Sequence, residues 1–286
     1  MLSDNRQYKE LEVTLGTYVP HMCDNYPQDN PYERLYRPVY DREFVVDESY
    51  PFVNDTPAER WLHFWAYPVI LYFIQGLRMR LGWGMQTKGR KWLRRYKKQL
   101  AGGAITIANH CHRHDAEAVL ISVGADRHTK IPMFAPNFAT KDQFLLRAVG
   151  GIPIPPAEAG MAAMKQFNQA FDEFHRRGYW FHVFPEAVKW LWYKPLRPFQ
   201  KGAFTMAYKY GMPLVPCVIN FRPRKGIYRL FGKQDEPCLT VQICEPILPD
   251  TSKPRKEEVA RLATLSHEAM CKAAGIVKNP WPVMEE

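Results

Sequence analysis

The chain has 286 residues and a net charge of +10, a length that suits one large core or two small ones. Its first twelve residues lack the apolar stretch of a signal peptide, and its six cysteines are scattered without a C-x-x-C pair. We therefore expect an intracellular protein and exclude a disulfide-stapled secreted domain.

The charge is unevenly distributed along the chain. Residues 1–59 hold 12 acidic and 5 basic side chains, whereas residues 60–286 hold 17 acidic and 34 basic ones. No Asp or Glu occurs between Arg60 and His114. Such a bias favours anionic partners: phospholipid headgroups, nucleotides, an acidic carrier protein or nucleic acid. No RNA- or DNA-binding motif accompanies the basic residues, so a nucleic-acid partner is not expected.

The first two segments differ in composition. Residues 1–55 are rich in Tyr, Pro, Asp and Asn and predict an irregular acidic arm. In residues 56–100 a helix is predicted to start at Thr56-Pro57, and it has almost no polar face. Pro68 should kink this helix, which leads into a basic cluster. Its apolar run is shorter than the about 20 residues of a spanning helix. This pattern is typical of a peripheral anchor on anionic membranes, and a buried core helix is the alternative.

Residues 101–286 alternate between apolar strand-like runs and helical patterns. This alternation predicts a single α/β domain with a mixed twisted sheet flanked by helices. Amphipathic spacing predicts a helix from Met161 to Phe174 that ends at Gly178, and further helices are predicted over 201–210 and 254–274. The predicted strands are 104–108, 131–135, 179–184, 214–221, 227–231 and 239–244.

The most informative stretch is Asn109-His110-Cys111-His112-Arg113-His114-Asp115, between a predicted buried strand and a predicted helix. A histidine and an aspartate five positions apart can form a base and its orienting carboxylate if the chain between them turns. In a continuous helix the two would lie about 140° apart. Two alternatives remain open. Asp115 could be only a helix N-cap, and His110, His112 and His114 could bind a metal ion.

Two further blocks follow, Val183-Phe184-Pro185-Glu186-Ala187-Val188-Lys189 and Pro198-Phe199-Gln200-Lys201-Gly202-Ala203-Phe204, and then an apolar strand-like run, Gly211-Met212-Pro213-Leu214-Val215-Pro216. In this order the chain resembles the glycerolipid acyltransferase family, whose best-known members acylate lysophosphatidic acid. The family's blocks read N-H-x-x-x-x-D, F-P-E-G-T-R and F-K-K-G with a downstream apolar strand. The resemblance extends over residues 104–221.

The resemblance implies an O-acyltransferase that moves a fatty acyl group to a hydroxyl of a lysophospholipid such as 1-acyl-glycerol-3-phosphate. The donor would be acyl-CoA or acyl-carrier protein, a co-substrate, with no cofactor or metal. His110 would be the general base, and Asp115 would hold its other ring nitrogen. The implied substrate-binding residues are Asn109, Glu186, Lys189, Lys201 and Gly202. The expected location is cytoplasmic, peripherally on the inner face of an anionic phospholipid membrane.

The chain departs from the family pattern at four places. Ala187 replaces a glycine, Lys189 an arginine, and Gln200 the first lysine of K-K-G. The segment Gly150–Pro156 lacks the arginine that the family associates with the acceptor's phosphate. The acceptor, the acyl chain length and the donor carrier therefore stay open, and a lipid-binding relative without catalysis is an alternative.

Other chemistries compete at the same residues. Cys111 is a rival nucleophile, but adjacent side chains of an extended segment point apart, so a pair with His110 is not expected. The histidine loop is similar to the H-x-H-x-D-H loop of metallo-β-lactamase-like hydrolases with its last two residues transposed, and such sites use further His and Asp ligands. Glu186 could form an ion pair with a nearby lysine instead of binding substrate.

Overall fold

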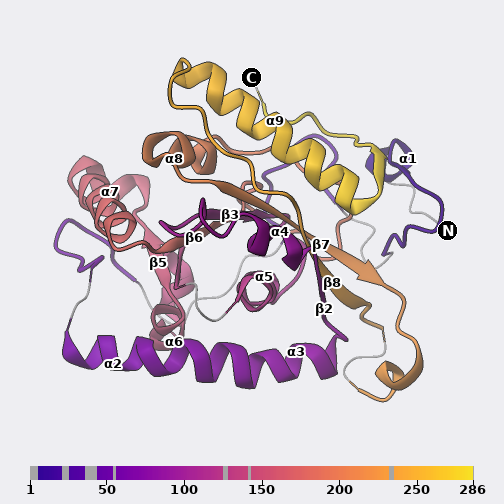
Figure 1. Ribbon diagram of the computed structural model, residues 1–286, viewed down its shortest axis with the longest axis horizontal. Helices are drawn as coiled ribbons and strands as arrows, with labels where there is room; N and C mark the ends of the chain where they lie inside the picture. The colour runs from indigo at the N-terminus through magenta and orange to yellow at the C-terminus, as the bar shows by residue number, and fades with distance from the viewer. Residues whose placement is uncertain are drawn as a thin grey trace.

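The computed structural model describes residues 6–20, 26–35, 44–53, 56–124, 128–140, 143–231 and 235–285, except the side chains of Glu59, His63 and Ala66. A seven-stranded sheet with the strand order β2-β8-β7-β3-β6-β4-β5 lies at its centre (Figure 1). All pairings are parallel except β7 with β8, so the predicted mixed α/β sheet is confirmed. The strands are β2 Gln86–Lys88, β3 Ile105–Ala108, β4 Thr129–Phe134, β5 Gly151–Ile154, β6 Trp180–Val183, β7 Leu214–Arg222 and β8 Cys238–Ile243.

Helices cover both faces of this sheet (Figure 1). The α-helices are α1 Arg6–Lys9, α2 Pro57–Ala66, α3 Gly76–Gly82, α4 Arg90–Arg95, α5 Asp115–Val123, α6 Gln143–Ala148, α7 Gly160–Arg176, α8 Gly202–Tyr210 and α9 Arg255–Ala274. The 3₁₀ turns are η2 Ala135–Ala139, η3 Ala157–Ala159 and η4 Gly226–Arg229. Gly178 (φ 73°) follows the end of α7 at the predicted position.

The central strand β3 is buried on both sides, which explains why its sequence is apolar throughout. Ala108 faces the core that includes α5, whereas Ile105 and Ile107 face the core that includes α7, α8 and α9. The carboxyl end of β3 lies between β6 and β7, with which it pairs in parallel. Residues that follow β3 and β6 therefore meet at one edge of the sheet, where ligand sites of α/β folds collect.

The acidic arm is only partly irregular. In its described part, β1 (Glu12–Val13) pairs antiparallel with β9 (Ile276–Lys278) in a separate two-stranded sheet. Tyr8 and Tyr26 pack into a small aromatic core with Trp190 and Tyr193. The arm thus buries Tyr8 and Tyr26 against the segment that follows the second sequence block.

The segments α2, η1 (Tyr67–Gln75, a π-helix) and α3 form one nearly straight rod along the lower edge of the molecule (Figure 1). The predicted kink at Pro68 is not seen, because the proline lies in the π-helical stretch, whose altered hydrogen bonding accommodates its missing N–H. Tyr67, Leu71 and Met79 are buried against α5 and the sheet. Among the residues described, no helix is long and apolar enough to cross a membrane.

Two features of the sheet differ from the prediction. Residues 227–231 are not a strand: they lie in the turn η4 and the two residues that follow it. Arg224 Nη1 donates to the carbonyls of Tyr228 (2.7 Å) and Phe231 (2.6 Å), which a strand would use for pairing. The short strands β2 and β5 were not predicted. Strand β5 contains Pro153, which its position at the edge of the sheet tolerates.

Candidate active site

His110 and Asp115 lie together at the carboxyl end of β3. The strand ends at Ala108 and α5 begins at Asp115, so the residues between them turn as the sequence required. His110 Nδ1 lies 2.6 Å from Asp115 Oδ2. This distance joins the ring to the carboxylate as a base is joined to its orienting group.

The Asp115 carboxylate is buried and fully used by neighbouring donors. The backbone amide of His112 donates to Oδ2 (3.2 Å) and that of Ala116 to Oδ1 (3.0 Å). Burial alone would raise the pKa of Asp115, but His110, Lys189 and the amide of His112 stabilise the anion, and the pKa is lowered. Its place in the first turn of α5 adds the favourable end of the helix dipole. Asp115 is therefore an anion that holds the histidine.

The His110 ring is fixed and still accessible. It stacks on Phe184 with ring centroids 4.0 Å apart and an angle of 14° between the planes. Its side chain is 19% exposed, and within the described part of the chain Nε2 has no hydrogen-bond partner. With Nδ1 bonded to Asp115, Nε2 is the nitrogen that can accept a proton from a bound hydroxyl.

Glu186 lies beside His110, and its carboxylate accepts hydrogen bonds from neighbouring protein groups. It is 2% exposed, and its Oε2 accepts from the His110 backbone amide (3.0 Å) and from Arg197 Nη2 (2.9 Å). Its Oε1 accepts from the Arg197 amide (3.1 Å). The ion pair offered as the alternative for Glu186 is present, with an arginine in place of the lysine. Glu186 therefore positions the base loop.

Arg197 is the site residue that the sequence reasoning missed. Its side chain is fully buried, stacks over Trp190 at 4.5 Å, and donates to the carbonyls of Pro31 (2.9 Å) and Val188. Its place in the largely apolar stretch from Trp190 to Phe199, which it shares with Lys194, was the available signal, since a buried arginine requires a partner.

Asn109 lies in the interior and not beside the histidine ring. Its Oδ1 accepts from the Ile219 amide (2.8 Å) and its Nδ2 donates to the Ile219 carbonyl (3.1 Å). These bonds tie the end of β3 to β7. In this position Asn109 supports the loop, and its side chain has no open path to a substrate.

Cys111 is 2% exposed, and burial raises the pKa of its thiol well above the ordinary value. Its Sγ accepts from Asn109 Nδ2 (3.2 Å). A thiol in this setting does not ionise readily, so the rival nucleophile has no support in the geometry.

The three histidines of the loop have separate partners. His112 is buried, lies edge-on to Trp83 and Trp192, and burial lowers its pKa to about 3. His114 Nδ1 lies 3.1 Å from Glu117 Oε1. No group of three or more His, Cys, Asp or Glu side chains among the described residues is placed to hold a metal ion. The arrangement that the hydrolase alternative needs is therefore not formed by these residues.

Lys189, Lys201 and Gly202 are exposed beside the second and third blocks. The charge of Lys189 is close enough to lower the pKa of Asp115, so this lysine lies near the candidate base. The Gln200 amide donates to the Pro185 carbonyl (2.7 Å), which joins the third block to the second, and Lys201 immediately precedes α8. The structure thus gathers the three blocks around one edge of the sheet.

The fold and this geometry define an α/β protein with a His–Asp pair at the carboxyl end of its central strand. Residues 86–220 match the family model described as Acyltransferase, and this stretch includes all three blocks. This match covers just under half of the chain, and it supports the assignment of residues 86–220 to the acyltransferase family.

The chain is similar to the crystal structure of the 1-acyl-sn-glycerophosphate (LPA) acyltransferase PlsC from Thermotoga maritima, with 17% sequence identity and a TM-score of 0.49. That similarity covers 76% of this chain and 82% of the other. No curated protein sequence gives a significant match.

Proposed function

We propose that the protein transfers a fatty acyl group from acyl-CoA or acyl-carrier protein to a hydroxyl of a lysophospholipid, with His110 as the general base. The observation that carries this proposal is the 2.6 Å contact between His110 Nδ1 and Asp115 Oδ2, which leaves Nε2 available on an accessible ring. The family assignment supplies the reaction class, and the motif resemblance supplies the substrate class.

The proposed step needs no enzyme nucleophile, because the thioester is already activated. The acceptor oxygen attacks the thioester carbonyl carbon while its proton moves to His110 Nε2. The carbon–sulfur bond then breaks, and the leaving thiolate takes that proton from the imidazolium. Asp115 stabilises the imidazolium between the two transfers. General-base help of this kind contributes about 10² to 10⁴ in rate.

Recognition of the acceptor would rest on lysines. Lys189 is exposed near the His–Asp pair, Lys201 is exposed at the start of α8, and lysine binds phosphate as a point charge. Arg197 does not replace the missing family arginine, since its side chain is fully buried against Glu186 and Trp190. We propose that the two lysines hold the phosphate of the acceptor.

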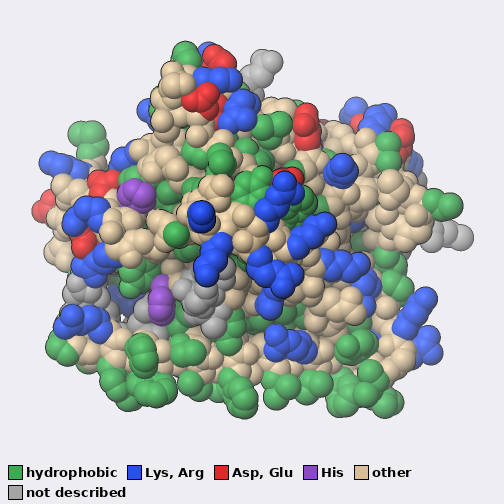
Figure 2. Space-filling model, viewed as in Figure 1, with side chains coloured by type: hydrophobic (Ala, Val, Ile, Leu, Met, Phe, Trp, Pro, Cys, Tyr) green, Lys and Arg blue, Asp and Glu red, His purple; other side chains and the backbone are tan. Residues whose placement is uncertain are grey.

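Membrane docking completes the proposal. The outer face of the rod formed by α2, η1 and α3 exposes large apolar side chains, which form a continuous green band along one edge in Figure 2. They are Trp61, Phe64, Trp65, Val69, Phe73, Ile74, Leu77 and Leu81. Lys and Arg side chains lie directly above this band. An apolar band bordered by cations fits the surface of an anionic bilayer.

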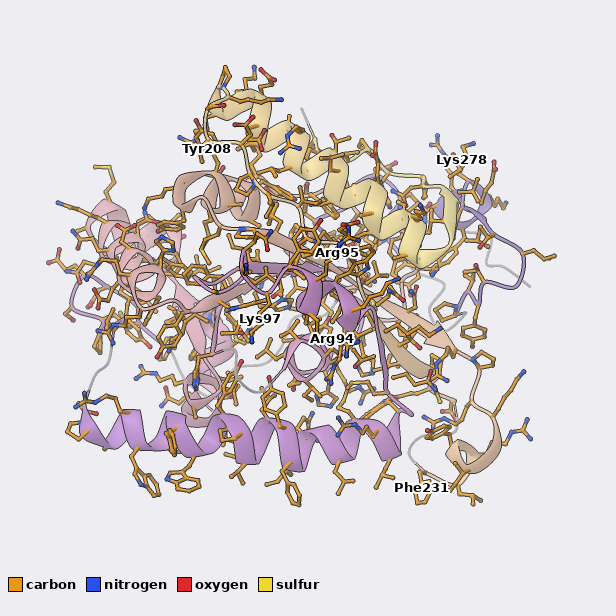
Figure 3. All side chains as sticks on the ribbon, viewed as in Figure 1. Arg94, Arg95, Lys97, Tyr208, Phe231 and Lys278 are labelled. Atoms are coloured by element: carbon orange, nitrogen blue, oxygen red, sulfur yellow. The ribbon has the colours of Figure 1, made fainter. Side chains whose placement is uncertain are left out.

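A second element reaches the same edge. Leu230 and Phe231 follow η4 and are exposed, and Figure 3 shows Phe231 at the level of the rod's side chains. Arg224 Nη2 donates to the Gly82 carbonyl at the end of α3 (2.9 Å), while its Nη1 holds the η4 turn. This arginine fixes the turn beside the rod, so both would touch one membrane surface.

Mass spectrometry of lipid products tests the proposed reaction. Purified protein is given an acyl-CoA or an acyl-carrier-protein donor with a panel of lysophospholipids, and His110→Ala serves as the control. We expect a diacyl product that is lost in the variant. Product formation that is unchanged by His110→Ala would contradict the proposed base. Vesicle binding without any product would favour a non-catalytic lipid-binding relative.

A further inference from the structure

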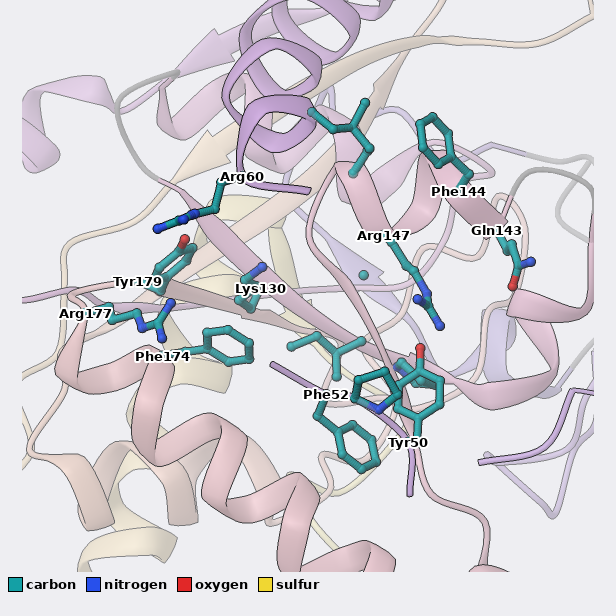
Figure 4. Close-up of a pocket in the computed structure, with 16 residues that line it drawn as sticks. Tyr50, Phe52, Arg60, Lys130, Gln143, Phe144, Arg147, Phe174, Arg177 and Tyr179 are labelled. Atoms are coloured by element: carbon teal, nitrogen blue, oxygen red, sulfur yellow. The ribbon is translucent and has the colours of Figure 1, made fainter. Parts of the chain in front are cut away.

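A basic pocket lies away from His110, between the arm, α2, α6, α7 and strands β4 and β5 (Figure 4). Its volume is about 260 Å³. Four cations from four separate elements line it: Arg60, Lys130, Arg147 and Arg177. None of the described residues that line it is acidic. Such a concentration of like charge favours an anion in the pocket.

Aromatic rings contact two of the cations that line the pocket. Figure 4 shows Arg60, Lys130 and Arg177 on one side and Arg147 on the other. The Arg147 guanidinium lies 5.0 Å from the Tyr50 ring, and Lys130 Nζ lies 4.8 Å from the Phe174 ring. These aromatic faces exclude water from one side of Arg147 and Lys130, which strengthens their attraction to a bound anion.

Arg147 is the best-placed group for a ligand. Its Nε is buried without a hydrogen-bond partner among the described residues. By contrast, Arg177 Nε already donates to Glu173 Oε1 (2.6 Å), outside the pocket lining. A buried N–H without a hydrogen-bond partner costs free energy, and a guanidinium can donate two parallel hydrogen bonds to phosphate oxygens in bidentate geometry. These features favour an anionic ligand with several oxygens, such as a phosphate group, over an apolar ligand.

The pocket is separate from the candidate active site. Tyr179 lines the pocket and precedes β6, whereas Phe184 stacks on His110 and follows β6. Five residues of extended chain span about 16 Å. The two sites are thus at opposite ends of one strand, and a phosphate in the pocket is not one that Lys189 or Lys201 would hold at the base.

We propose that this pocket binds a phosphate ester through Arg147 and Lys130, at a site distinct from the catalytic one. Two sources share this chemistry: the headgroup of an anionic phospholipid, next to the membrane-facing helix α2, and the phosphorylated nucleotide of a coenzyme. The proposal does not depend on acyl transfer, because it rests on the pocket alone.

Isothermal titration calorimetry of the full chain tests it with three probes: inorganic phosphate, adenosine 3′,5′-bisphosphate and soluble dioctanoyl phosphatidic acid. Arg147→Gln and Lys130→Gln remove one charge each from the pocket. Arg94→Gln and Lys256→Gln are matched controls, since both residues are exposed and do not line it. Circular dichroism checks that each variant is folded. If Arg147→Gln does not fold, the titration of Lys130→Gln tests the proposal.

We expect at least one probe to bind, with affinity reduced tenfold or more by the pocket variants and less than twofold by the controls. Tighter binding of the bisphosphate than of the lipid would identify a nucleotide source, and the reverse order a lipid source. His110→Ala should bind the probes like the unchanged protein. The absence of binding by all three probes, or equal losses in pocket and control variants, would overturn the proposal.

Discussion

The backbone amide of His110 donates a hydrogen bond to Oε2 of Glu186 (3.0 Å). The same oxygen accepts from Arg197 Nη2 (2.9 Å), so a buried ion pair anchors the loop that carries the candidate base. The second sequence block thereby holds the first in place. In this arrangement Glu186 supports the loop that carries His110.

The first prediction concerns this ion pair. Glu186→Gln leaves the Arg197 cation buried without its counter-charge, and we expect a loss of about 3–5 kcal/mol in the free energy of unfolding. The double variant Glu186→Gln/Arg197→Met should lose less than the two single variants together, because it leaves no unpaired charge. Urea unfolding of the four proteins measures this coupling, and strictly additive losses would show that the pair carries no structural role.

The second prediction concerns Asp115. Its pKa is lowered, so it stays ionised at neutral pH and can hold the His110 tautomer. Asp115→Asn should lower the rate of acyl transfer by about 10²–10⁴ while the protein remains folded. Glu117→Gln is a matched control in the same helical turn, because Glu117 contacts His114 and not His110. Steady-state rates that fall equally in both variants would contradict the assigned role.

The third prediction concerns Ala187, which stands where the family has glycine. Its φ of 61° is in the left-handed region, where a Cβ atom costs about 1–2 kcal/mol. Ala187→Gly should therefore raise the free energy of unfolding by about 1 kcal/mol. Ala203→Gly, within α8, should lower it by a similar amount, since glycine weakens a helix. Chemical denaturation compares them, and a destabilised Ala187→Gly protein would refute the strain.

The fourth prediction concerns stability at acid pH. Burial lowers the pKa of His182 to about 4, below the about 6.5 of an unfolded chain. The unfolded state therefore binds the proton first as the pH falls, and stability present above pH 6.5 is lost progressively towards pH 4. We expect this residue to cost about 2 kcal/mol at pH 5. Urea unfolding at pH 7 and pH 5 measures the loss.

A non-ionisable variant provides the control for that measurement. His182→Leu should reduce the difference between pH 7 and pH 5, although it loses the contact with Thr106 Oγ1 (2.9 Å) at both values. His112 and His267 are also buried with lowered pKa values, so part of the dependence should persist. An unchanged difference in His182→Leu would mean that this histidine does not titrate as described.

The fifth prediction concerns the apolar band. Phe73→Asp on the rod and Leu230→Asp after η4 should each weaken binding to vesicles with anionic lipid by tenfold or more. Each substitution removes an exposed apolar side chain that the membrane would bury, and it adds a negative charge that anionic lipid repels. Met161→Asp is the matched control, since Met161 is 91% exposed in α7, away from the rod. Sedimentation with vesicles measures it, and equal losses in all three would indicate only a charge effect.

Comparison of these variants shows whether the rod and the η4 turn both contact the membrane. If Phe73→Asp weakens vesicle binding and Leu230→Asp does not, the rod docks alone and the η4 turn lies off the membrane. If neither variant differs from Met161→Asp, the band does not bind lipid.

Much of this protein could be predicted from its sequence, because the decisive patterns are local. The α/β sheet was predicted from apolar runs along the chain. The contact between His110 and Asp115 was predicted from the loop between them and from the order of the three blocks. The rod formed by α2, η1 and α3 was predicted to be apolar, but the sequence did not show which side chains would face the core and which would face outward. Only packing decided that Tyr67 and Leu71 face the core while Phe73 faces outward.

The roles of several side chains depended on contacts between residues far apart in the chain. Asn109 is bonded to Ile219, 110 positions away, and Arg197 reaches the carbonyl of Pro31 in the arm. The basic pocket gathers cations from four elements that no sequence window contains together. Local periodicity fixes which elements form, whereas burial and hydrogen-bond partners, which decide whether Glu186 binds a substrate or an arginine, exist only after those elements pack.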